Sequence, residues 1–244
     1  MPSLEAYSRN LDYSYAPGLF PSMEALKKHP ESVRRLLLSS KAEGHEGAEK
    51  LISLAEQHHI RVEIADKALS RISGKENCFA AAVFEKKNTS LQPGNHIVLH
   101  HISDAGNLGT ILRTALGMEW KDIAIIKPAT DAFDPKVVRA SMGAIFSLRL
   151  HEYEDFADYR AEFPANTLYP FMLDGSVLLH DAVDGAKSPC TLVFGNEGSG
   201  LPSEFAQLGQ ATRIPHNNEI DSLNLGIAAA IGMYTFGQAI QCRK

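Results

Sequence analysis

The chain has 244 residues, of which 44% are hydrophobic and 22% charged, and its formal net charge is −5. This composition excludes a disordered chain, and the length suits a small domain followed by a larger one. The negative charge also excludes a protein that coats nucleic acid without selectivity, because such binding depends on clustered Lys and Arg.

Targeting, thiol and metal signals are weak along the whole chain. No apolar run approaches the roughly 20 residues that span a bilayer, and the N-terminus lacks the layout of a signal peptide, so we expect a cytoplasmic protein with no membrane partner. Cys78, Cys190 and Cys242 form no CxxC pair, and we expect reduced thiols. The adjacent histidine pairs at 58–59 and 100–101 make poor joint ligands on a strand, so we expect no metal site.

The first 90 residues predict a small α/β domain. Apolar patterning predicts strands at 32–40, 60–65 and 78–86, and helices at 46–59 and 66–72, the last with Asp66 as its N-cap. The polar segment 86–95 contains Pro93 and Gly94 and predicts a linker. We therefore expect one domain at 1–90 and a second at 96–244. Residues 1–95 carry 13 Lys and Arg against 12 Asp and Glu, whereas the remainder carries 11 against 17.

The second domain alternates apolar strands with helical patterns. Its expected elements are strands at 96–102, 122–128, 147–153, 167–175 and 190–197, and helices at 107–118, 134–146 and 222–240. Such alternation predicts a parallel sheet covered by helices, with ligands held in loops at the carboxyl ends of the strands.

The first of three candidate loops leads into the helix at 107–118. Asn107 is a natural helix N-cap, and a structural role for Asn107 and Gly109 remains open. That role does not extend to Arg113, which lies about two turns into the helix among apolar or small neighbours. A guanidinium there needs an anionic partner, and a phosphate is one such partner.

The second and third loops follow apolar strands late in the chain. Gly195, Gly198 and Gly200 have the order GxxGxG, which differs from the GxGxxG dinucleotide fingerprint; a plain turn with Glu197 as a capping residue is the alternative to a ligand loop. In the third loop we expect Ser222 to cap the long closing helix, whose mouth suits a carboxylate or phosphate oxygen. The small residues of that helix favour close packing and a homodimer.

Taken in order, these loops resemble the motifs of the SpoU or TrmH family of RNA ribose 2'-O-methyltransferases, within the SPOUT superfamily. The resemblance covers roughly residues 96–242 and includes the segment RASMGAIF at 139–146. The chain departs from the family pattern at His216, Asn218 and Gly226. The three motifs are NxGxxxRT, with Asn107, Gly109, Arg113 and Thr114; GxExxGL, with Gly195, Glu197, Gly200 and Leu201; and IPxxxxxxSLN, with Ile214, Pro215, Ser222, Leu223 and Asn224.

The resemblance implies a parallel-sheet methyltransferase domain with a C-terminal trefoil knot, preceded by a small ribosomal-protein-like RNA-binding domain. It implies S-adenosylmethionine as the cofactor, a structured RNA as the substrate, with ribosomal RNA ahead of transfer RNA, and a homodimer. The implied cofactor residues are Gly195, Asn196, Glu197, Ile214, Ser222 and Leu223. The implied catalytic residues are Arg113, Asn107, Glu197, Ser222 and Asn224.

The role of Arg113 has two interpretations. An ordinary guanidinium stays protonated at neutral pH, so we favour a phosphate clamp, with the ribose proton leaving to a phosphate oxygen or water; Asn107 and Asn224 would orient Arg113 or the hydroxyl. A strongly shifted Arg113 acting as the base is the alternative. Two other functions remain open for the chain, a non-catalytic RNA-binding module and an enzyme that methylates a base nitrogen.

Overall fold

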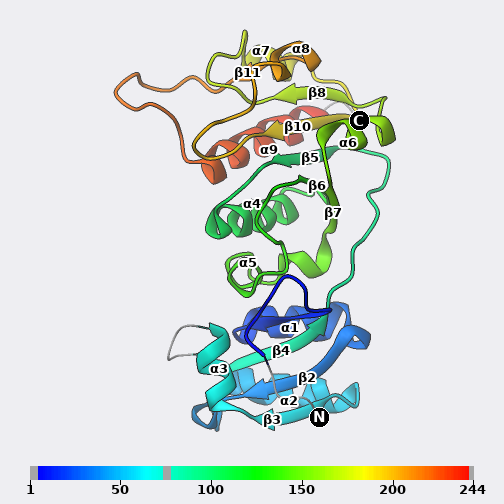
Figure 1. Ribbon diagram of the computed structural model, residues 1–244, viewed down its shortest axis with the longest axis vertical. Coiled ribbons are helices and arrows are strands. Elements are labelled where there is room, and N and C mark those ends of the chain that lie inside the picture. The colour runs from blue at the N-terminus through cyan, green and yellow to red at the C-terminus, as the bar shows by residue number, and fades with distance from the viewer. Residues whose placement is uncertain (1–4, 74–77, 242–244) are drawn as a thin grey trace. The chain divides into compact units, whose positions relative to one another are not determined.

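The computed structural model describes residues 5–73 and 78–241 (Figure 1). The chain divides into two compact units, Met1–Lys87 with Asp131–Ser147, and Asn88–Thr130 with Leu148–Lys244. The sequence places segment 131–147 in the second domain, but this segment packs in the first unit. There the Phe146 ring lies 4.8 Å from that of Phe84, edge to face, and Gly143 lies close to Pro21.

The sheet of the first unit has the order β1-β4-β2-β3. Strands β1 and β2 run antiparallel to β4, and β3 runs parallel to β2. The central strand β4 is buried from its first residue to Phe84, which explains its unbroken apolar sequence. The four strands are β1 (Tyr13–Pro17), β2 (Val33–Leu38), β3 (Arg61–Ile64) and β4 (Ala80–Glu85).

The helices of the first unit follow the expected apolar spacing with two corrections. The first amide bonded in α3 is that of Leu69, which donates to Ala65 O, so Ala65 precedes the helix and Asp66 is its first residue, not its cap. The expected helix at 134–146 stops at Ala140, because Met142 and Gly143 have positive φ. The helices are α1 (Leu19–Lys28), α2 (Glu46–Gln57), α3 (Asp66–Ser73) and α5 (Pro135–Ala140), with short 3-10 turns η1 (Pro30–Ser32), η2 (Ser40–Ala42) and η3 (Ala144–Ser147).

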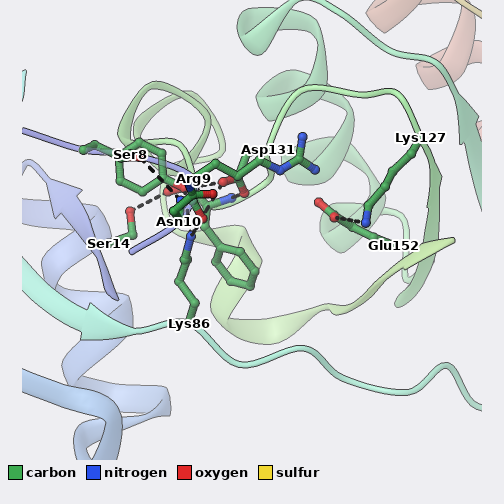
Figure 2. A network of polar contacts seen from close by, with 10 residues as sticks. Ser8, Arg9, Asn10, Ser14, Lys86, Lys127, Asp131 and Glu152 are labelled. Carbon is green, nitrogen blue, oxygen red and sulfur yellow. Dashed lines mark hydrogen bonds and ion pairs between the residues drawn. The ribbon is translucent and has the colours of Figure 1, made fainter. Parts of the chain in front are cut away.

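A polar cluster ties segment 131–147 to the rest of the first unit. Figure 2 shows Lys86 reaching towards Arg9 and Asp131. Its Nζ donates to Arg9 O at 2.8 Å and lies 3.8 Å from Asp131 Oδ2, while the Tyr7 hydroxyl donates to the same carboxylate oxygen. Burial raises the pKa of Tyr7, and the bond to Asp131 raises it further. The Asp131 charge is therefore paired and hydrogen-bonded, as a largely buried carboxylate requires.

The second unit contains a parallel sheet with the order β7-β6-β5-β10-β8. All residues of β5, β6 and β10 are buried, as expected for strands covered on both faces. The strands are β5 (His96–His100), β6 (Asp122–Ile126), β7 (Arg149–Tyr153), β8 (Thr167–Pro170) and β10 (Cys190–Phe194), and β9 (Val177–Leu178) pairs with β11 (Thr212–Arg213) in a separate two-stranded sheet.

Helices of the second unit pack around this sheet, and α9 contacts both α4 and β10. No helix among residues 5–73 and 78–241 is long and apolar enough to cross a membrane. Cys78 and Cys190 are buried free thiols, whereas Cys242 lies outside the described residues. The helices are α4 (Ala105–Gly117), α6 (Phe156–Glu162), α7 (Leu179–Asp184), α8 (Phe205–Leu208) and α9 (Leu225–Gln241).

Candidate functional site

The Glu197 carboxylate joins the loop after β10 to the loop after β5. Its Oε2 accepts from Ser103 N at 3.1 Å and Ser103 Oγ at 2.8 Å, and its Oε1 accepts from Asp104 N at 2.9 Å. Partial burial raises the pKa of Glu197, but these hydrogen bonds outweigh it and leave the pKa below its ordinary value. The carboxylate is thus held in its charged form as a fixed link between the first two motifs.

Asn107 extends this link to the third motif. Its Nδ2 donates to Glu197 Oε1 at 3.3 Å, and its Oδ1 accepts from Asn224 Nδ2 at 3.0 Å. The alternative in which Asn107 caps α4 is wrong, because Asp104 is the N-cap and its carboxylate accepts from Asn107 N at 2.7 Å. The Asn107 side chain is therefore free to bridge the other two loops.

The start of α9 also differs from the expectation. The helix begins at Leu225, and Asn224 Oδ1 accepts from Ile227 N at 3.3 Å, so Asn224 performs the capping expected of Ser222. Ser222 is exposed and precedes the cap by two residues. Asn224 thus combines a structural role with its contact to Asn107.

The loop after β10 depends on two glycines. A Cβ on Gly195 would lie 2.3 Å from the Gly200 carbonyl carbon, so only glycine allows this backbone approach. Gly200 has φ +69°, in the left-handed region that favours glycine, and its amide donates to Asn196 O at 2.9 Å. The Asn196 side chain closes the same turn, since its Oδ1 accepts from Gly198 N at 2.9 Å. The motif is a tight, internally bonded turn.

This turn forms one side of a cavity of about 370 Å³ within the second unit. All six residues expected to bind the cofactor line the cavity: Gly195, Asn196, Glu197, Ile214, Ser222 and Leu223. The cavity is also lined by residues that sequence reasoning did not assign to the site, among them Phe171, Leu173, Asp174 and Arg213. The first three follow β8, a strand whose buried sequence gave no sign of a ligand. Asn107, Arg113 and Asn224 do not line the cavity.

Arg113 lies on the exposed side of α4. The buried residues of the helix are on its other face and include Leu108, Ile111 and Leu112. Arg113 therefore needs no buried anionic partner, contrary to the expectation from its apolar neighbours. Within the described part of the chain, we find no hydrogen bond or ion pair made by its guanidinium.

Two further polar residues lie near the end of β5: Ser103, which the sequence did not assign to the site, and His100. Ser103 supports Glu197 and is itself held by Thr130, whose hydroxyl donates to Ser103 O at 2.6 Å. His100 is 7% exposed, its Nδ1 has no hydrogen-bond partner, and its ring stacks on His101 with centroids 3.8 Å apart. Burial and, to a smaller extent, the neighbouring His101 together lower the pKa of His100 to about 4. His100 is therefore neutral at neutral pH.

No group of three or more His, Cys, Asp or Glu side chains suited to hold a metal ion occurs among residues 5–73 and 78–241.

Comparison with known proteins places these features in a family. Residues 94–234, more than half of the chain, match the SpoU rRNA Methylase family, and the chain belongs to this family. It is 29% identical over 145 residues to the 23S rRNA (adenosine(1067)-2'-O)-methyltransferase of Streptomyces laurentii, a match that covers 58% of this chain and 53% of the relative. The chain spans about half the length of several curated relatives it matches.

Solved structures extend the likeness over most of the chain. The crystal structure of an AdoMet-bound rRNA methyltransferase from Sinorhizobium meliloti has a TM-score of 0.78 and 28% identity, covering 93% of this chain and 87% of that one. A second structure, from work on 2-OH methylation of C/U34 on tRNA, has a TM-score of 0.57 and 27% identity. It covers 61% of this chain and 97% of its own.

Proposed function

We propose that the protein transfers a methyl group from S-adenosylmethionine to a ribose 2'-hydroxyl of RNA. The observation that carries this proposal is the hydrogen-bonded chain from Ser103 through Glu197 and Asn107 to Asn224. It brings together the three motifs of the SpoU family beside one cavity. A plain turn at Gly195 with a capping glutamate would not require these long-range bonds.

The cavity fits the cofactor in size and chemistry. Small-molecule sites have volumes of about 300–1,000 Å³ and combine apolar walls with a few polar groups, and this cavity has both. Gly195, Ile214 and Leu223 would hold the cofactor mainly through backbone atoms, with Asn196 and Ser222 in the same pocket. The bound cofactor supplies an electrophilic methyl group, and the residues around it orient the RNA hydroxyl towards that group.

Arg113 is assigned to the RNA. Its exposure and the absence of a described partner suit a clamp that grips a phosphate through two parallel hydrogen bonds. A clamp leaves the ribose proton to a phosphate oxygen or to water. Asn107 and Asn224 position the loops around the hydroxyl, and Glu197 is a positioning residue because both of its carboxylate oxygens already accept hydrogen bonds.

Ribosomal RNA is the proposed substrate, and the names of the relatives support it. Transfer RNA is the second candidate, supported by the likeness to the structure from work on tRNA methylation. We further propose that the first unit contributes to RNA binding. The chain around β10 and α9 would form the trefoil knot that the SPOUT resemblance implies, supported by the insertion of β10 between the earlier strands β5 and β8.

A methylation assay tests the function directly. The protein is incubated with isotope-labelled S-adenosylmethionine and separate ribosomal and transfer RNA fractions, followed by nuclease digestion and mass spectrometry. We expect a 2'-O-methylated nucleoside in the ribosomal fraction. Label in a base would indicate a base methyltransferase, label in the transfer RNA fraction would favour the second substrate, and binding of RNA without label would indicate a non-catalytic module.

A further inference from the structure

Two stacked aromatic rings form an apolar wall of the cavity. Phe171 follows β8 and Phe194 ends β10, and their ring centroids lie 4.5 Å apart with the ring planes inclined by 28°. Phe194 is only 1% exposed, whereas Phe171 is half-buried. The position of the Phe171 ring therefore affects how much of the cavity is open to a ligand.

Helix α9 packs against this pair through Gly232. A Cβ on Gly232 would lie 2.7 Å from Phe171 Cζ and 3.1 Å from Phe194 Cζ. Contacts below 3.0 Å force a neighbour to move, and here the nearest atom is the tip of the Phe171 ring. Phe194 is enclosed, whereas Phe171 is half-buried and lines the cavity, so the Phe171 ring is the one with room to move. A side chain at position 232 would therefore displace the Phe171 ring from its place in the cavity wall.

We infer that Gly232 is a positioning residue that sets the depth of the cofactor cavity through Phe171, without touching the ligand itself. This inference rests on the proposed function, because it assumes that S-adenosylmethionine occupies this cavity. It also gives a specific reason for a glycine in the middle of a long helix, where alanine is the better helix former.

Calorimetric titration with S-adenosylmethionine, and with S-adenosylhomocysteine as an unreactive probe, tests the inference. We expect Gly232→Ala to weaken binding of both probes by about tenfold, as overpacking of a close contact does. Gly237→Ala is the matched control on the same helix, since its Cβ would lie 3.6 Å from Trp120 Nε1, an ordinary contact. It should leave the affinity unchanged, and unchanged affinity in Gly232→Ala as well would overturn the inference.

The same substitution in a Phe171→Leu background tests whether Gly232 acts through the Phe171 ring. Phe171→Leu removes the ring tip that meets the new Cβ, so adding Gly232→Ala to Phe171→Leu should change its affinity less than about twofold. An equal loss in both backgrounds would show that Gly232 acts by another route. If Gly232→Ala alone fails to fold, recovery of folding in the double variant supports the ring clash, and failure of both variants refutes it. A wild-type protein that binds neither probe would instead refute the proposed function.

Discussion

At the scale of single residues, Arg113 and the hydrogen-bonded pair of Asn107 and Asn224 have different roles in the site. Arg113 is exposed and lies outside the cavity, whereas Asn107 and Asn224 bond to each other at 3.0 Å. We predict that Arg113→Ala abolishes methyl transfer but leaves S-adenosylmethionine affinity within a few-fold. Arg113→Lys should also abolish methyl transfer, because lysine keeps the positive charge but lacks the planar guanidinium that donates two parallel hydrogen bonds to a phosphate. Single-turnover assays and calorimetry measure the two effects; near-normal turnover in Arg113→Lys would show that charge alone suffices.

His100 predicts a pH dependence of stability. Its pKa is about 4 in the folded protein, because of burial and then of His101, against about 6.5 in an unfolded chain. Between these values the unfolded chain binds a proton that the folded protein does not, so the free energy of unfolding falls as the pH falls. Between pH 7 and pH 5, the free energy of unfolding should therefore fall by about 2 kcal/mol more in the wild type than in His100→Leu.

Urea unfolding of both proteins at pH 7 and pH 5 measures this difference. The control is His180→Leu, which changes a histidine whose side chain is 67% exposed. An identical pH dependence in wild type and His100→Leu would contradict the assignment.

The sequence indicated that polar residues in these loops matter, but not which of them caps a helix and which bridges two loops. Ser103, Asp104 and Asn107 are all good capping residues within five positions, and nothing local shows that Asp104 takes the cap. Likewise, Ser222 and Asn224 compete for the start of α9. Ser103 supports a carboxylate 94 residues away, a contact that depends on two loops meeting at one edge of the sheet. Local pattern does not contain that information.

At the level of elements, the turn after β10 behaves as one unit. We predict that Gly195→Ala destabilises the protein by about 2 to 3 kcal/mol and weakens S-adenosylmethionine binding, because the new Cβ would strike the Gly200 backbone. The collision is with the chain itself, at the Gly200 carbonyl group and the Leu201 amide nitrogen. Gly198→Ala is the control in the same turn, with its Cβ 3.6 Å from Asn196 Oδ1.

Denaturant unfolding and calorimetry of both variants measure this prediction. Equal stability of Gly195→Ala and Gly198→Ala would refute the close approach as the reason for the glycine. The strands of the sheet were predictable, because β5, β6 and β10 are short, mostly apolar segments that are buried throughout. The turn's internal bonds were not, because they depend on a φ at Gly200 that the sequence permits but does not specify.

At the scale of the whole molecule, the sequence did not predict that segment 131–147 packs in the first unit. That segment follows β6 in the chain, yet its Asp131 pairs with Lys86 and its Phe146 packs on Phe84 in the first unit. Apolar periodicity shows that a segment has a buried face, but not which core receives it. The uneven charge along the chain did not predict this packing either, because the ion pair joins two single residues, Lys86 and Asp131.

The exposed side of α9 is the candidate interface for the homodimer expected from the sequence. The small residues of this helix are used inside the unit, since a Cβ on Gly226 would lie 3.3 Å from Thr110 Cγ2 and Gly232 meets Phe171. The exposed side instead carries Ile227, 52% exposed, and Tyr234, 55% exposed, which share a face at a spacing of seven residues.

Burial of both side chains in a two-fold interface would remove this apolar surface from water. We therefore predict a dimer at micromolar concentration and a monomer after Ile227→Asp with Tyr234→Asp, measured by light scattering across a dilution series. Phe20→Asp is the matched control, because Phe20 is an apolar side chain of the first unit that is 69% exposed. It should leave the dimer intact if α9 forms the interface. A monomeric wild type would refute the dimer, and a dimer that survives both aspartates would place the interface elsewhere on the protein.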